Sequence, residues 1–332
     1  MAVKDMRFMK EGVRLLPVEW VAVVYGVLTC VLMVIMWPRL VDPAGMLILR
    51  AEWLALTVSL LALSRLRFFA TKKKLTDFLR VLAQMGWLSQ WYPDTYEFNR
   101  SFNNLDHVFA AAEQSLFSCQ PAIEFSQALP GAVWSEAFNL GYWSYFPMIG
   151  VLVIAVFWME RQKKILQDFH WLAATIMTSF FLYYAIYIFL PVTGPQFYFQ
   201  AVGIQEIAAG HFPPLGTYFS QHTEMLPAPG YADGLFYHFV HASQAAGERP
   251  TAAFPSSHIG ISTIVLLLSR RHAPRLTPFL LPFWILLCCA TVYIQAHYLI
   301  DAIAGLASVP VILWMATRLN RGWRACAPSG QG

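Results

Sequence analysis

The sequence contains few charged residues and few cysteines. Only 13% of its 332 residues are Asp, Glu, Lys or Arg, which is about half the share in soluble domains. No block of basic residues interleaved with aromatics occurs, so the sequence does not favour nucleic-acid binding. The five cysteines have no Cys-x-x-Cys spacing, and we expect neither a disulfide nor a zinc site. An internal repeat and a low-complexity tract are also lacking.

Apolar residues are abundant instead. They account for 57% of the chain, against about 45–50% in soluble proteins. Several stretches approach the ~20 apolar residues that cross a ~30 Å hydrocarbon core. We therefore predict an all-α, multi-pass membrane protein. The segment Met1–Arg14 is long, mixed in charge and lacks a small-residue cleavage site, which indicates a signal anchor rather than a cleaved signal peptide.

Seven apolar stretches are clear candidates for membrane crossings. They are Trp20–Trp37, Met46–Ser64, Phe138–Trp158, Trp171–Pro191, Ser256–Ser269, Thr277–Ile294 and His297–Thr317. Five short basic clusters hold 18 of the 23 Lys and Arg residues, and such clusters favour the cytoplasmic side of a membrane. All five share one side only if one more crossing lies between Lys74 and Arg161.

Leu75–Tyr92 is the best candidate for this eighth crossing. It is weakly apolar and carries Asp77, Arg80 and Gln84, which neighbouring helices would have to shield from lipid. The alternative is an amphipathic helix that lies on the membrane surface. With eight helices, both termini are cytoplasmic, and residues 93–137 and 192–255 form two long loops on the opposite side.

Two histidines stand where apolar runs begin on the non-cytoplasmic side. His258 follows Pro255-Ser256-Ser257, and His297 precedes Asp301 by four residues, so on a helix these last two share a face. A carboxylate in that position can orient an imidazole and stabilise its cation. One oriented imidazole can then act as a nucleophile and the other as a general acid.

Ser256, Ser257 and Arg249 are candidate phosphate contacts. Serines favour helix N-caps, a helix N-terminus attracts anions, and Arg249 is the only Lys or Arg in its long loop. With the two histidines, this set favours phosphoryl transfer through a phosphohistidine without a metal ion or cofactor. Three alternatives stay open. The serines would be caps only, the pair His297 and Asp301 would be structural or half of a metal site, and Arg249 would contact lipid headgroups.

In these motifs the chain resembles the type 2 phosphatidate phosphatase superfamily of membrane enzymes. That family's pattern joins Lys-(x)6-Arg-Pro, Pro-Ser-Gly-His and Ser-Arg-(x)5-His-(x)3-Asp. The second motif appears here as Pro255-Ser256-Ser257-His258. The third appears as Ala290-Thr291, five further residues, His297 and Asp301.

The resemblance implies a role for each matched residue. His297 would be the nucleophile, Asp301 its orienting partner and His258 the acid for the leaving group, with Ser256 and Ser257 as phosphate contacts. The resemblance covers a six-helix catalytic core at residues 75–317. Residues 1–74, with the signal anchor and the second membrane helix, and the basic cytoplasmic tail 318–332 lie outside it.

Two departures from the family pattern bear on whether the enzyme transfers a headgroup or hydrolyses a phosphomonoester. Thr291 replaces an arginine, and the first motif is missing, since the segment after Trp171–Pro191 continues as Val-Thr-Gly-Pro. The Pro-x-x-Gly-Pro segment is similar to the inositol phosphorylceramide synthase branch, which moves a phospho-headgroup between lipids. A phosphomonoester dianion needs more positive charge than a phosphodiester monoanion, so fewer cations favour the transferase.

We therefore expect a phosphotransferase that moves a headgroup such as inositol phosphate between phospholipids or sphingolipids. Its partners would be a lipid phosphate ester, a lipid or water acceptor and the membrane, with no obligatory protein partner. The alternative enzyme is a phosphatase for a phosphatidate-like or polyprenyl-phosphate-like monoester. A transporter is a second class, in which Arg50, Glu52, Asp77 and Arg80 would mark a pathway, although no inverted repeat supports it. We expect a bacterial inner-membrane protein whose active site faces away from the cytoplasm.

Overall fold

The computed structural model describes residues 14–163 and 166–322, and these ranges contain helices and no β-strand. The predicted all-α fold is therefore confirmed for them. The elements are α2 Pro17–Met36, η1 Trp37–Arg39, α3 Pro43–Leu63, α4 Arg67–Thr71, α5 Lys73–Gly86, α6 Leu88–Asn99, α7 Asp106–Phe117, α8 Pro121–Ala128, α9 Ala132–Trp143, α10 Tyr145–Glu160, α11 Gln167–Phe189, α12 Pro195–Val202, α13 Ile204–Ala208, η2 Tyr218–Ser220, α14 Leu235–Gly247, α15 Ser257–His272, α16 Thr277–Tyr293 and α17 Leu299–Leu319.

Several of these helices are long and apolar enough to cross a membrane. Four qualify on their own, namely α2 with η1, α3, α11 and α17. The pair α9 and α10, bent by 46°, would add a fifth as one broken span. These lengths and compositions agree with a membrane protein. The eight crossings expected from charge distribution include shorter helices and stay a prediction.

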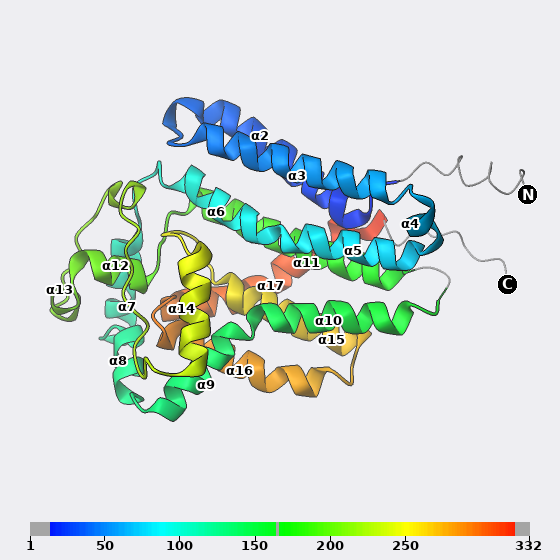
Figure 1. Ribbon diagram of the computed structural model, residues 1–332. Coiled ribbons are helices and arrows are strands. Elements are labelled where there is room, and N and C mark those ends of the chain that lie inside the picture. Colours follow the sequence, from blue (N-terminus) through cyan, green and yellow to red (C-terminus); the bar gives the residue numbers. More distant parts are fainter. Residues whose placement is uncertain (1–13, 164–165, 323–332) are drawn as a thin grey trace, which may run out of the picture.

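The helices form an elongated bundle with a cap at one end (Figure 1). Helices α2, α3, α5, α10, α11 and α15 to α17 run roughly along a common direction, while α14 lies across them. Helices α7, α8, α12 and α13 gather at one end of the bundle. Of the two segments expected as long loops, 93–137 folds largely into helices, and 192–255 contains α12, α13, η2 and α14 joined by irregular stretches. These helices form because apolar side chains such as Tyr198, Phe199 and Ile207 pack with Tyr298 in a small core of their own.

The segment that carries the second basic cluster, from the end of α3 through α4 to the start of α5, lies at the other end of the bundle, as does the end of α10 beside the third cluster (Figure 1). Lys74 donates a hydrogen bond from Nζ to the carbonyl oxygen of Arg161 at 2.7 Å, so the second and third clusters are in contact. This arrangement agrees with a common cytoplasmic side for these two clusters. Most of the first cluster, all of the signal anchor before Arg14 and the tail from residue 323 onward lie outside the described residues.

Helix α11 forms the centre of the bundle. Its side chains are buried on nearly all sides, as expected for a helix that is apolar around its whole circumference. Three buried tyrosines lie in its last two turns, namely Tyr183, Tyr184 and Tyr187. The Tyr187 hydroxyl donates a hydrogen bond to the carbonyl oxygen of Pro255 at 2.9 Å. Helix α11 therefore supplies the inner wall on which the other helices are arranged.

Leu75–Tyr92 forms α5 and the first part of α6, which meet at Trp87. Asp77, Arg80 and Gln84 are buried, whereas the apolar Leu75 and Leu79 point outward at 47% and 44% exposure. Arg80 pairs with Glu19 of α2 at 2.6 Å, and Gln84 accepts a hydrogen bond from the Trp53 indole at 2.9 Å. A surface helix would present its polar face to water, so this inverted distribution favours the membrane-spanning interpretation.

The buried pair between Arg80 and Glu19 generates a prediction about stability. Arg80→Ala leaves the Glu19 carboxylate buried and unpaired, which should cost about 3–5 kcal/mol. We expect a marked drop in the melting temperature of the purified protein in detergent. Lys73→Ala is the control, because Lys73 is 76% exposed in its pair with Asp77 and should change stability by less than about 1 kcal/mol. The double variant Glu19→Leu/Arg80→Met should recover most of the loss. Equal melting temperatures for Arg80→Ala and Lys73→Ala would contradict this role for the pair.

Candidate active site

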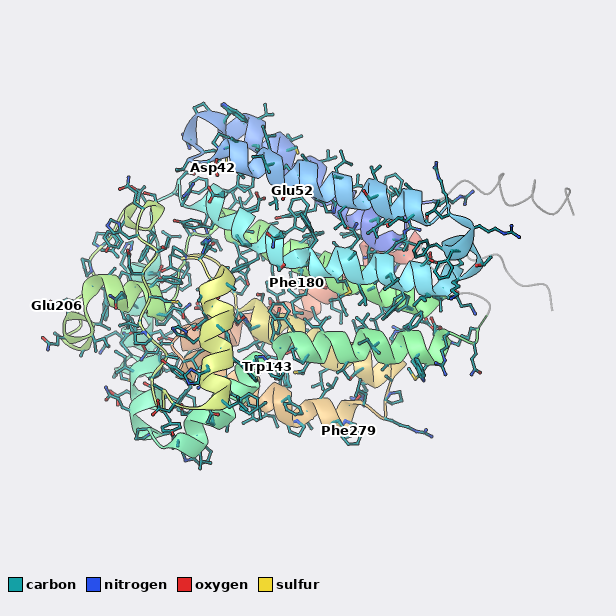
Figure 2. All side chains as sticks on the ribbon, viewed as in Figure 1. Asp42, Glu52, Trp143, Phe180, Glu206 and Phe279 are labelled. Carbon is teal, nitrogen blue, oxygen red and sulfur yellow. The ribbon has the colours of Figure 1, made fainter. Side chains whose placement is uncertain are left out.

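A cavity of about 440 Å³ lies beside the start of α15. One wall comes from α6, the opposite wall from the junction of α9 and α10, and the remaining sides from α11, α14 and α15. Figure 2 labels two lining residues, Phe180 on the α11 side and Trp143 at the α9–α10 junction. His258 and Ser257 also line the cavity. The space therefore opens directly onto one of the two histidines singled out in the sequence.

The start of α15 is held by a local cap and by a close approach to α17. Ser256 is the N-cap, and its Oγ accepts a hydrogen bond from the Ile259 N–H at 3.5 Å. The Ser256 N–H donates to the carbonyl oxygen of Asp301 at 3.0 Å. Gly305 permits this contact, because a Cβ at that position would lie 2.5 Å from the Ser256 carbonyl oxygen. The sequence thus places His258 in the first turn of α15, against the first turns of α17.

His297 lies in the turn between α16 and α17. The Gln295 backbone, with φ of 63°, adopts the left-handed region, which is uncommon for non-glycine residues and is often found at functional sites. The His297 N–H donates to the carbonyl oxygen of Thr291 at 3.0 Å. Thr291, which stands where the family pattern has arginine, is thus a buried structural residue here.

The Pro-x-x-Gly-Pro segment supports this turn from outside. The Gln196 N–H donates to the Gln295 carbonyl oxygen at 2.7 Å. Gly194 has φ of 91°, and a Cβ there would clash with the Ala296 carbonyl oxygen. Asp106 of α7 holds the same segment, because its carboxylate accepts hydrogen bonds from the Thr193 N–H at 2.7 Å and the Gly194 N–H at 2.8 Å. The two capping segments therefore fix the position of His297.

The two imidazoles are in direct contact. His258 Nδ1 lies 3.2 Å from His297 Nε2, and the ring planes meet at 67°. His297 Nδ1 lies 2.9 Å from the carbonyl oxygen of Ala253. Because a carbonyl only accepts, the proton of neutral His297 is on Nδ1, and its Nε2 carries a lone pair. His258 must then donate from Nδ1 to that lone pair.

Asp301 lies beside His297 but is bonded elsewhere. Its Oδ2 is 3.7 Å from His297 Nδ1, which is longer than a hydrogen bond, and it accepts from the Tyr298 N–H at 2.9 Å. The carboxylate therefore caps the first turn of α17 and lies beside the His297 ring without a hydrogen bond to it. The carbonyl of Ala253 fixes the ring directly, a role the sequence spacing assigned to Asp301 alone.

The three candidate phosphate contacts occupy different places. Ser257 lines the cavity, whereas Ser256 is the buried cap of α15. Arg249 is half-buried, and its Nη1 donates to the carbonyl oxygen of Glu248 at 2.9 Å. It is not among the residues that line the cavity, and its positive charge acts on Glu97 of α6.

The cavity also contains residues that sequence reasoning missed. Tyr142 stacks on His258 with ring centroids 4.7 Å apart, and Tyr145 lies 4.5 Å from the same ring. Glu248 lines the cavity and accepts a hydrogen bond from the Tyr92 hydroxyl at 2.7 Å. No motif marks these residues, because they come from α6, the α9–α10 junction and the end of α14. For Glu248, the one hint in the sequence is that it directly precedes Arg249, a candidate phosphate contact.

Burial controls the protonation of the candidate nucleophile. It lowers the pKa of His297 to about 4, against the smaller opposing effects of the Ala253 carbonyl and the Glu248 carboxylate. Above that pH the imidazole is neutral and Nε2 keeps its lone pair. Among the described residues, no group of three or more His, Cys, Asp and Glu side chains is arranged to hold a metal ion. The arrangement suits nucleophilic attack by His297 with proton transfer by His258.

Comparison with known proteins gives one finding. Residues 107–315, nearly two thirds of the chain, match a family model described as the PAP2 superfamily. The matched range contains both histidines, Asp301 and the segments that hold them. Searches of curated proteins and of solved structures give no match.

The lowered pKa of His297 can be tested by titration. In protein labelled with nitrogen-15 at histidine, the resonances that disappear in His297→Gln should titrate with a midpoint near pH 4. A short unstructured peptide with the same neighbours is the control and should titrate near the usual value of about 6.5. The sign follows from burial, which disfavours the charged ring, so the neutral form persists as the pH falls until about 4. A midpoint at or above that of the peptide would contradict the neutral nucleophile.

Proposed function

This chain belongs to the PAP2 superfamily, and we propose that it is a membrane phosphotransferase that moves a phospho-headgroup between lipids through a phosphohistidine on His297. The observation that carries the proposal is the contact between His258 Nδ1 and His297 Nε2 at 3.2 Å. It pairs a nucleophilic lone pair with a proton donor beside a cavity. Family membership supports lipid phosphate chemistry in general, and the remaining details are our inference.

The first half of the reaction uses both histidines. The phosphorus of the lipid enters between the rings and replaces their hydrogen bond. His297 Nε2 attacks, an N–P bond forms, and the P–O bond to the leaving group breaks. His258, as an imidazolium that also carries a proton on Nε2, gives its Nδ1 proton to the departing oxygen and is left as the neutral ring. The Ala253 carbonyl and the Asp301 carboxylate stabilise the positive charge that develops on the His297 ring.

The second half returns the enzyme to its starting state. His258, now without its Nδ1 proton, accepts the proton of the acceptor hydroxyl. The acceptor oxygen attacks phosphorus, a P–O bond forms and the N–P bond breaks. A lipid alcohol as acceptor gives headgroup transfer, and water gives hydrolysis. Because both share the phosphohistidine, a phosphatase for lipid monoesters is the second candidate function.

The lack of cationic side chains in the cavity lining favours the transferase over the phosphatase. The cavity lining includes no Lys or Arg among the described residues. A monoester dianion would need such groups more than a diester monoanion does. The transporter class gains no support, since Arg50 pairs with Asp94 at 2.9 Å and Arg80 with Glu19 at 2.6 Å. Pairs of this kind tie the helices together and do not line the cavity.

We further propose eight membrane crossings, with a six-helix core at 75–317. The alternating course of the helices along the bundle supports this topology (Figure 1). The capped end, which holds the histidines, would face away from the cytoplasm, and the basic end would face it. The phospho-group would therefore be transferred at the outer leaflet, as in a bacterial inner membrane.

Variants of the two histidines should separate the nucleophile from the acid. His297→Ala should abolish release from every phosphate ester, because no N–P bond can form. His258→Ala should retain slow release from an activated aryl phosphate, whose leaving group needs no proton, and lose activity on lipid esters. The measurement is phenolate release and lipid headgroup exchange by purified protein in detergent.

These assays should contain EDTA, since the proposed chemistry uses no metal ion. His238→Ala is the control for changing a histidine, because His238 is exposed on α14 and not among the cavity-lining residues. Equal, complete loss in both active-site variants with the aryl phosphate would argue against these roles. Activity that EDTA abolishes and only a divalent ion restores would overturn the metal-free mechanism.

Arg249 remains our proposed phosphate clamp. To reach phosphate, its guanidinium must leave the Glu248 carbonyl oxygen and bind two phosphate oxygens with its planar fork. Arg249→Ala should then lower turnover by about 10²–10³-fold, and Arg249→Lys should cost less but stay impaired. Arg100→Ala is the matched control, because Arg100 pairs with Glu97 on α6. Turnover at the wild-type rate in a folded Arg249→Ala protein would place the clamp elsewhere.

A further inference from the structure

An unbroken arc of aromatic rings lines the cavity. It begins at His258, against which Tyr142 and Tyr145 pack with centroid distances of 4.7 and 4.5 Å. Tyr145 in turn lies 6.2 Å from Phe180 of α11. All four residues are part of the cavity lining. The rings therefore continue from the candidate acid into the interior of the cavity.

The arc ends at a carboxylate. Phe180 lies 6.0 Å from Tyr184, and Tyr184 lies 6.2 Å from Tyr92. The Tyr92 hydroxyl donates to Oε1 of Glu248 at 2.7 Å. Tyr184, Tyr92 and Glu248 also line the cavity. Glu248 acts electrostatically on His297 as well, so the carboxylate is close to the reacting centre.

The charges in this cavity are unusual for a site that takes a phosphate. Within the described part of the chain, its lining carries one carboxylate and no Lys or Arg. Arg249, which does not line the cavity, acts electrostatically on Glu248, but the lining itself offers an anionic headgroup no cation to offset the repulsion. Burial raises the pKa of Glu248 against the smaller opposing effects of the Tyr92 hydroxyl, His297 and Arg249, and a cation inside the cavity would further favour its charged form. The missing positive charge is best supplied by the substrate.

Aromatic faces next to a carboxylate are the usual recognition site for ammonium groups. The ring quadrupole attracts a cation placed over its face, and the attraction grows when water is excluded. The quaternary ammonium group of choline is large, weakly hydrated and positively charged, so it suits rings and a carboxylate together. The primary ammonium group of ethanolamine is more compact and can also donate hydrogen bonds to the carboxylate. Hydrogen-bonding groups in the lining, such as Ser243 and Gln244, would serve a polyol such as inositol as well, so the carboxylate among the rings is the feature that favours an ammonium group.

We propose that the aromatic arc and Glu248 bind the ammonium group of a zwitterionic phospholipid headgroup, such as choline phosphate or ethanolamine phosphate. The proposal rests on the phosphotransfer function above and names the donor lipid for it. The phosphorus lies at the His258 end of the arc, and the ammonium group lies at the Glu248 end. The ammonium group would offset the charge of Glu248, and the phosphate would be left to Arg249, the clamp proposed above, which reaches it from outside the lining. This choice departs from the inositol phosphate that the sequence resemblance implies.

The test measures binding separately from chemistry. The His297→Ala protein, which lacks the nucleophile, is titrated in detergent with short-chain lipids that share identical acyl chains and differ only in headgroup. The choline phosphate lipid should bind about 30-fold more tightly than the inositol phosphate lipid, the equivalent of about 2 kcal/mol for a desolvated cation–π site. Equal affinities, or tighter binding of the inositol lipid, would overturn the proposal.

Two pairs of variants in the same background locate the site. Glu248→Gln should weaken binding of the choline lipid by at least about 30-fold, because a desolvated charge partner is lost. Tyr142→Leu should weaken it by about tenfold, whereas Tyr142→Phe, which keeps the ring, should bind within about threefold of the parent. The exposed Glu206→Gln and Tyr218→Leu are matched controls outside the cavity. Unchanged affinity in a folded Glu248→Gln protein would contradict the proposal, even if Tyr142→Leu does not fold.

Headgroup transfer by the wild-type protein then separates the two proposals. Transfer that is faster from choline or ethanolamine lipids than from inositol or glycerol lipids supports both. Faster transfer from the inositol lipid overturns the ammonium site and leaves the phosphotransferase intact. Tight binding of the choline lipid without transfer or hydrolysis of any headgroup overturns the phosphotransferase and leaves the ammonium site intact.

Discussion

The hydrogen bond between His258 and His297 is the interaction on which the rest of the site depends. It requires His297 to be neutral, with its Nδ1 proton held by the Ala253 carbonyl and its Nε2 lone pair free to accept. Burial provides that state by disfavouring the charged ring. Two backbone contacts hold the turns that carry the rings. The cap of α15 is bonded to the first turn of α17, and the start of α12 is bonded to the turn before His297.

The same low-polarity surroundings explain how the protein treats its other charges. The buried arginines are paired, Arg80 with Glu19 and Arg50 with Asp94, because an unpaired charge there would be costly. These pairs join the N-terminal hairpin α2–α3 to α5 and α6. The N-terminal helices therefore complete the wall of the bundle beside the core that carries the histidines.

Glu248 differs from these ion pairs because it faces a cavity. It is hydrogen-bonded to the Tyr92 hydroxyl and lines a cavity whose described lining offers no positive partner. A carboxylate that faces a cavity lined by aromatic rings is suited to a cation from outside. The aromatic arc and the two histidines then share one substrate, with its cation and its phosphorus at opposite ends.

The sequence alone determined the helical class, the membrane character and the two histidine motifs. These features can be recognised locally, because they depend on the length of apolar stretches and on spacings of a few residues. It also indicated that Asp77, Arg80 and Gln84 need shielding, which the structure provides through α2 and α3. Only the tertiary structure could decide that Ala253 rather than Asp301 holds the His297 ring, and that Arg249 lies outside the cavity. It alone brought Glu248 and the tyrosines together, because they come from helices far apart in the chain and their proximity depends on how those helices pack.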